Sequence, residues 1–143
     1  MCLKVRFGQR IKVAKEHIVV YKTFGSVKPT HVISEYVGFK YLYGKVYSLG
    51  KKIVRSDYND NHKEIDEGFH SFCDTSKTFF NCLELICIIP KGARYIKGTF
   101  DIYSMSFPSY VSDKIIVTRV KRSESFDVNK YMKRKFPELC QKN

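Results

Sequence analysis

The segment 83–89, Leu-Glu-Leu-Ile-Cys-Ile-Ile, is apolar at every position but one, and the turn sequence Pro90-Lys91-Gly92 follows it directly. A short apolar run that is rich in isoleucine and bounded by turn residues is typical of a strand buried on both faces. Such a strand needs a neighbouring strand on each side and a cover over each face. The segment therefore predicts a sheet with residues 83–89 at its centre.

The N-terminal part of the chain alternates between apolar and polar residues, first over 3–7 and again over 10–14. A period of two residues is the pattern of a half-buried strand, with one face on the core and the other in solvent. The polar face of both runs is basic and consists of Lys4, Arg6, Arg10 and Lys12. We expect these two strands to present a row of positive charge.

Near the C-terminus the spacing of the apolar residues changes from that of a strand to that of a helix. Apolar residues at 128, 131, 132 and 136 fall on one face of a helix over 127–136. Ser125 or Asp127 would cap its start, and Pro137 would end it near residue 136. The opposite face of this helix is basic and carries Lys130, Lys133, Arg134 and Lys135.

These patterns predict an α+β fold in a single, β-rich domain, with a mostly antiparallel sheet or a partly open barrel. Residues 1–122 would form the β-rich part, and the basic helix and tail over 123–143 would pack on it. One short internal helix is expected over about 76–82. Residues 56–63 and the Pro108-containing stretch 104–109 are expected to be loops.

The charge of the chain is strongly positive and unevenly distributed. Lys and Arg number 26 and Asp and Glu 14, so the formal net charge is +12. Residues 57–74 hold six acids and one base, which leaves a net charge of +17 on the other 125 residues. A surface this basic attracts polyanions. Nucleic acid, a nucleotide and an acidic protein face are all candidate partners, and a well-solvated lysine-rich surface is the alternative reading.

Between residues 38 and 47 aromatic rings alternate with lysines. The rings are Phe39, Tyr41, Tyr43 and Tyr47, and the lysines are Lys40 and Lys45. Aromatic side chains can stack on bases while lysines contact phosphates, so this strip is a candidate nucleic-acid surface. The alternative is a core built from Tyr and Phe, with the tyrosine hydroxyls at the surface.

The five cysteines form neither an even set nor a CxxC pair, which favours free thiols and the reducing cytoplasm, although a place in a virion stays open. No metal site and no cofactor are predicted, because no group of ligands has the spacing of a zinc site.

No stretch approaches the ~20 apolar residues that span a bilayer, and the N-terminus has no signal-peptide pattern. Self-association of the chain is left open.

His70 is the most enzyme-like residue, and Cys73 lies three residues further on. A Cys–His pair is a nucleophile only if the two side chains meet in space. The alternative, which we favour, is that His70 bonds a backbone carbonyl. P-loop, dinucleotide-binding and zincin motifs are absent, and the lack of a Glu-x-Glu pair argues against ADP-ribosyl transfer.

Three short motifs occur in order along the chain: Gly-Phe-Lys-Tyr with Gly-Lys-Val-Tyr over 38–47, Gly-Phe-His-Ser-Phe over 68–72 and Ile-Pro-Lys-Gly over 89–92. In these, residues 15–120 resemble a family of small proteins from bacteriophages and phage-derived regions of gut bacteria. The resemblance implies an origin in a mobile element. That family has no established activity, so the resemblance assigns no catalytic residue.

The sequence leaves three hypotheses for function. The first is a non-enzymatic, phage-type basic protein that binds nucleic acid, a nucleotide signal or the acidic face of a host defence protein. The second is a structural or packaging component of a virion, and the third is a small enzyme centred on His70.

Overall fold

A computed structural model gives the fold of the chain. It describes residues 3–6, 9–34, 38–53, 56–57, 62–65, 68–73, 83–102, 105–122 and 124–139. The expected internal helix over 76–82 lies outside these residues.

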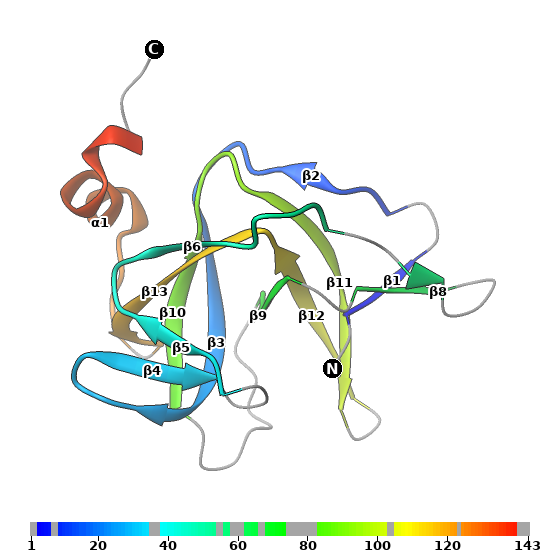
Figure 1. Ribbon diagram of the computed structural model, residues 1–143, viewed down its shortest axis with the longest axis horizontal. Coiled ribbons are helices and arrows are strands. Elements are labelled where there is room, and N and C mark those ends of the chain that lie inside the picture. The colour runs from blue at the N-terminus through cyan, green and yellow to red at the C-terminus, as the bar shows by residue number, and fades with distance from the viewer. Residues whose placement is uncertain are drawn as a thin grey trace.

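The described chain is built mainly from β-strands, with a single α-helix near the C-terminus (Figure 1). The strands are β1 (Leu3–Arg6), β2 (Lys12–Val13), β3 (Ile18–Val27), β4 (His31–Ser34), β5 (Lys40–Leu42), β6 (Val46–Ser48), β7 (Ser56–Asp57), β8 (His62–Ile65), β9 (Phe69–Phe72), β10 (Leu83–Ile89), β11 (Arg94–Ile102), β12 (Met105–Ser112) and β13 (Lys114–Lys121). Helix α1 spans Val128–Lys135, and a 3-10 turn, η1, spans Pro137–Leu139. The predicted β-rich α+β class is confirmed.

All strand pairs in the described residues are antiparallel, and they join into one sheet. The order along the sheet is β6-β13-β10-β3-β9-β12-β11-β1-β8-β7, with β2 beside β11 and the β4–β5 hairpin beside β3. Of the two architectures expected from the sequence, the chain adopts the open antiparallel sheet, because its two terminal strands, β6 and β7, do not pair.

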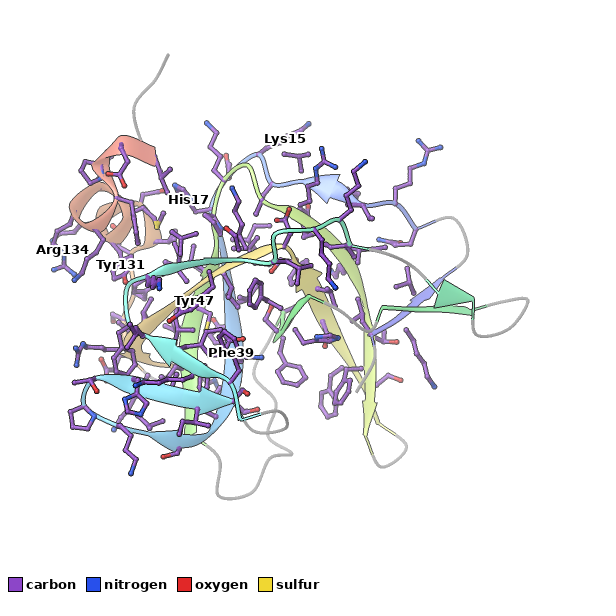
Figure 2. The ribbon with its side chains drawn as sticks, viewed as in Figure 1. Lys15, His17, Phe39, Tyr47, Tyr131 and Arg134 are labelled. Carbon is purple, nitrogen blue, oxygen red and sulfur yellow. The ribbon has the colours of Figure 1, made fainter. Side chains whose placement is uncertain are left out.

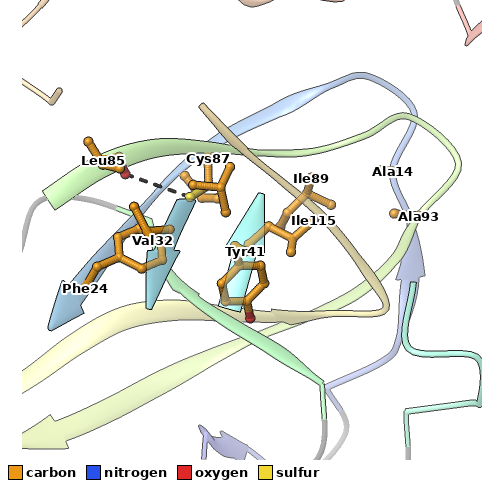
Figure 3. Packing of buried hydrophobic residues seen from close by; sticks show 11 residues of the cluster. Ala14, Phe24, Val32, Tyr41, Leu85, Cys87, Ile89, Ala93 and Ile115 are labelled. Carbon is orange, nitrogen blue, oxygen red and sulfur yellow. Dashed lines mark hydrogen bonds between the residues drawn. The ribbon is translucent and has the colours of Figure 1, made fainter. Parts of the chain in front are cut away.

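Strand β10 lies between β3 and β13, and both of its faces are buried, as the apolar run predicted. Leu85, Cys87 and Ile89 face a core that also contains Phe24 and Tyr41 (Figure 3). On the other face, Ile88 is fully buried beneath α1. The helix therefore covers the face of β10 that the sheet itself leaves open.

Helix α1 begins and ends where the sequence indicates. The Asp127 side chain accepts a hydrogen bond from the Lys130 backbone N–H at 3.1 Å, so Asp127 is the N-cap. The helix ends before Pro137, which has no N–H to continue it. Tyr131 and Met132 are buried against Ile88 and Ile116, and Val128 and Phe136 flank them; the four apolar positions thus share the face that contacts the sheet.

The expected loop at 104–109 is wrong, because Met105–Ser112 forms strand β12 between β11 and β9. Proline is disfavoured in strands because it cannot donate a ladder hydrogen bond. Here the pairing of β12 with β9 ends at Ser109, one residue after Pro108. The Pro108 carbonyl accepts a hydrogen bond from Cys73 N–H at 3.0 Å, so the proline contributes only as an acceptor on this side.

The expected loop at 56–63 is wrong at both ends, which form β7 and the first residues of β8, while residues 58–61 lie outside the described part of the chain. Strand β8 pairs along its whole length with β1, and Lys4 lies opposite Glu64 in the register. Opposite charges at facing positions favour such a pairing. The acidic part of the chain therefore adds an edge to the sheet beside its basic N-terminal strand.

Both cysteines that the structure describes, Cys73 and Cys87, are free thiols, as expected. Cys87 is fully buried in the core, and burial raises the pKa of its thiol to about 12 although the Lys22 cation acts in the opposite direction. A thiol with such a pKa stays protonated at neutral pH and acts as a small apolar side chain. Within the described residues, no helix combines the length and apolarity needed to cross a bilayer.

Gly98 of β11 lies directly against the backbone of β1. A Cβ atom at this position would collide with the backbone carbonyl oxygen of Lys4 and would lie 2.9 Å from Leu3 Cγ. Because a backbone atom cannot move aside without disturbing the strand, we expect Gly98→Ala to lower the free energy of unfolding by about 1–3 kcal/mol in urea denaturation. Gly98→Leu should lower it further.

Gly38 is the matched control, because a Cβ there meets no atom within 4 Å. Alanine at Gly38 is destabilising only because the backbone is left-handed there, and leucine meets the same strain. The free energies of unfolding of Gly38→Ala and Gly38→Leu should therefore agree within about 0.5 kcal/mol. An unchanged urea midpoint for Gly98→Ala would contradict the close approach of the two strands.

Candidate anion-binding surface

The solvent face of α1 is basic apart from Asn129. Lys130, Lys133, Arg134 and Lys135 are all exposed, while Tyr131 and Met132 between them point into the core. In the part of the chain that the structure describes, none of these four cations has an ion-pair partner. Four neighbouring positive charges without a counter-charge give this face a strong attraction for anions.

The turn between β5 and β6 lies beside this helix. Gly44 has φ +68°, and a Cβ there would lie 3.5 Å from the Tyr131 hydroxyl and 4.0 Å from Lys135 Nζ. The Gly44 N–H donates a hydrogen bond to the Val117 carbonyl of β13 at 2.9 Å, which fixes the turn on the sheet. The structure thus brings Lys45 to the basic face of α1, two groups that the sequence suggested separately.

Cations lie over tyrosine rings at this corner of the molecule. The Arg119 guanidinium is 4.6 Å from the centre of the Tyr43 ring, Lys45 Nζ is 5.1 Å from the Tyr47 ring, and the Arg134 guanidinium is 5.9 Å from the Tyr131 ring. Arg119 also donates a hydrogen bond to the Pro29 carbonyl. These contacts hold the cations in place through the attraction between a positive charge and a ring face.

Burial raises the pKa of Tyr131, whereas the nearby cations Arg134 and Arg119 act to lower it. Arg119 belongs to this cluster because it lies over the ring of Tyr43, the residue before Gly44 in the turn beside α1, although the sequence analysis did not single it out. Arg119 is exposed at the point where β13 reaches solvent, after the four consecutive buried residues Ile115 to Thr118.

The aromatic strip is buried at one position and partly exposed at the others. Tyr41 is only 4% exposed and packs on Phe24, with ring centres 6.1 Å apart, so its prediction as a base-stacking residue is wrong. The hydroxyls of Tyr43 and Tyr47 are used within the protein: the first donates to the Lys28 carbonyl, and the second accepts from the Leu42 N–H. Phe39 is exposed, but it packs against Tyr41 and Tyr47 (Figure 2).

The other predicted cations lie elsewhere. Five strands separate β1, which carries Lys4 and Arg6, from β13 in the sheet order, and Figure 1 places β1 and α1 at opposite ends of the molecule. Lys4 faces Glu64 in the register and has an interaction partner already. Arg10 and Lys12 are exposed near β2, and Lys40 is exposed on β5. The N-terminal and C-terminal cations therefore do not form one patch.

His70, the weak catalytic candidate, is half-buried on β9. Its Nδ1 lies 3.2 Å from the Gly68 carbonyl oxygen, which fits the backbone contact that we favoured. Val111 is its cross-strand partner, whereas Tyr110 pairs with Ser71 and shares the opposite face of the sheet. Side chains alternate between faces along a strand, so Cys73, directly after β9, falls on the face of Ser71, opposite to that of His70, and the register gives no support to a nucleophile pair.

Metal binding finds no geometric support in the part of the chain that the structure describes: no three side chains of the His, Cys, Asp and Glu types gather there. Comparisons of the chain with models of protein families, with curated proteins and with solved structures find no match. The geometry of the described residues therefore carries the functional argument.

The contact between Arg119 and Tyr43 can be measured by a double-mutant cycle. We expect Arg119→Gln and Tyr43→Leu to be coupled by about 0.5–1 kcal/mol in the free energy of unfolding, as for a partly exposed cation over a ring. Lys121→Gln is the control, because Lys121 is exposed on the same strand. Its cycle with Tyr43→Leu should be additive. Additivity in both cycles would show that Arg119 is not held by the ring.

Proposed function

We propose that this protein is a non-enzymatic binding protein of phage or mobile-element type that contacts the phosphate backbone of nucleic acid. The contact surface is the α1 corner, which comprises Lys45, Arg119, Lys130, Lys133, Arg134 and Lys135. The observation that carries the proposal is the unpaired basic face of α1 with Lys45 beside it. The resemblance of the motifs to small phage proteins agrees with such a role.

Phosphates rather than bases fit the α1 corner. A cation already lies over one face of each of the Tyr43, Tyr47 and Tyr131 rings, so a base would compete with it for that face. The rings therefore serve as supports for the charges. Contacts of this kind position a protein on a nucleic acid without reading its sequence.

Binding through phosphates has a defined salt dependence. Each phosphate that a cation neutralises releases condensed counterions, so the logarithm of the affinity falls with the logarithm of the salt concentration by about 0.9 per contact on duplex DNA. We expect similar affinities for duplexes of different sequence and a steep loss of affinity as salt is added.

The central test is a triple substitution, Lys133→Gln, Arg134→Gln and Lys135→Gln. These side chains are exposed, so each change should leave the free energy of unfolding within about 0.5 kcal/mol. Fluorescence anisotropy with a random-sequence duplex should show weaker binding and a salt slope smaller by up to about 2.7, or 0.9 for each of three lost contacts.

The control removes the same charge elsewhere, by Arg94→Gln, Lys97→Gln and Lys114→Gln, which are exposed on β11 and β13. It should leave the slope nearly unchanged. An equal loss in both triple variants would mean that net charge alone attracts the DNA. An unchanged affinity and slope in the first variant would exclude the α1 corner and favour an acidic protein as the partner.

A further inference from the structure

A second basic feature lies away from the α1 corner. An open groove of about 1180 Å³ runs between β2, the start of β3 and the turn from β10 to β11. Lys12, Lys15 and Lys91 line it, and Glu16 is the one carboxylate among its lining residues. Figure 2 shows Lys15 and His17 on this side of the molecule. No residue of the α1 corner belongs to the lining.

The groove is built on paired backbone rather than on a loose loop. Strand β2 pairs with the start of β11, with Lys12 opposite Tyr95. The Ala14 N–H donates to the Ala93 carbonyl, and the Gly92 N–H donates to the Ala14 carbonyl, each at 2.8 Å. These bonds fix the backbone segments that carry Lys12, Lys15 and Lys91 relative to one another.

His17 contributes a hydrogen-bond donor to the same groove. The Lys91 backbone N–H donates to His17 Nδ1 at 2.9 Å, so Nδ1 carries the lone pair and Nε2 carries the proton. Burial, and after it the Lys91 cation, lowers the pKa of His17 below its ordinary value. The imidazole is therefore neutral at pH 7, with its Nε2–H available to an acceptor.

Apolar surface accompanies these polar groups. Val13 is 55% exposed, but it pairs with Arg94 and so lies on the opposite face of the β2–β11 pair from Lys12 and Tyr95. Tyr95 and Ile18 are half-buried in the same lining, and Tyr95 is held edge-on by Tyr110 with ring centres 5.5 Å apart. A ligand that joins an anionic group to a flat apolar group would use both parts of the groove.

We propose that this groove binds a nucleoside phosphate, either as a free nucleotide or as the phosphorylated end of a strand. The phosphate would lie among Lys12, Lys15 and Lys91 with His17 as donor, and the base would lie against Tyr95, which shares a face of the β2–β11 pair with Lys12. The volume exceeds that of a mononucleotide, so water fills the remainder. The site does not depend on the α1 corner.

The test is isothermal titration calorimetry with AMP, inorganic phosphate and adenosine as separate probes. AMP should bind more tightly than either of the other two probes. Inorganic phosphate lacks the base, and adenosine lacks the phosphate, so each makes only part of the contacts. A 5′-phosphorylated trinucleotide then distinguishes the two sources: tighter binding than AMP indicates a strand end, and weaker binding indicates a free nucleotide.

Substitutions assign the binding to the groove. Lys15→Gln with Lys91→Gln should weaken AMP binding at least about tenfold, since hydrogen bonds to a charged group are lost. Glu16→Gln should strengthen it by removing the opposing carboxylate, a gain that unfolding cannot produce. Tyr95→Leu should weaken binding of AMP but not of phosphate, because the ring that contacts the base is lost. Lys28→Gln, an exposed lysine at the β3–β4 turn, should change nothing.

The outcome that would overturn the proposal is equal AMP binding in the wild type and the Lys15/Lys91 variant, or no AMP binding at millimolar concentration. The triple variant of α1 separates this site from the proposed function. It should bind AMP as the wild type does, and a loss of AMP binding there would assign the nucleotide to the α1 corner instead.

Discussion

The burial of β10 on both faces is the constraint on which the rest of the structure depends. Its neighbours β3 and β13 satisfy its backbone, and Phe24 and Tyr41 lie in the core over one face. The other face exposes Ile88 unless something covers it, and α1 does so with Met132, which is fully buried. Burying a side chain of this size stabilises a protein by about 1.5–3 kcal/mol. Because the apolar stripe of α1 faces the sheet, its basic residues face solvent.

The same packing determines where positive charge accumulates. Like charges at one corner repel one another and destabilise the compact state. Tyrosine rings beneath Arg119, Lys45 and Arg134 offset part of this cost. The strand pairing that places Glu64 opposite Lys4 lies at the far end of the sheet, away from α1.

Local patterns predicted those elements whose environment is uniform along their length. The run 83–89 is apolar at all but one position because both faces of the strand are buried, and α1 has a clear period because one face meets the sheet. Pro108 and the acids of 56–63 misled the prediction, because whether a strand accepts a proline or an acid depends on the neighbouring strand. Proline is tolerated where the pairing with β9 ends, and the register of β7 with β8 places Asp57 opposite Lys63.

The sites were predicted less completely than the fold, for a related reason. Periodicity located the basic face of α1, but it could not show that Gly44 would bring Lys45 beside Lys135, or that Arg119 would lie over Tyr43. The groove near His17 was missed because β2, β3 and the turn after β10 each contribute only a few of its residues. Sites assembled from distant segments need the register of the sheet, which short sequence patterns do not contain.

The central claim is that nucleic acid meets this protein at the α1 corner. Amide chemical shifts of the ¹⁵N-labelled protein, recorded while a random-sequence duplex is added at low salt, would test it most directly. We predict that the largest changes occur at Gly44, Lys45 and Lys130–Lys135, and that the amides of β1 change little. Largest changes at β1, or equal changes over the whole sheet, would contradict the account.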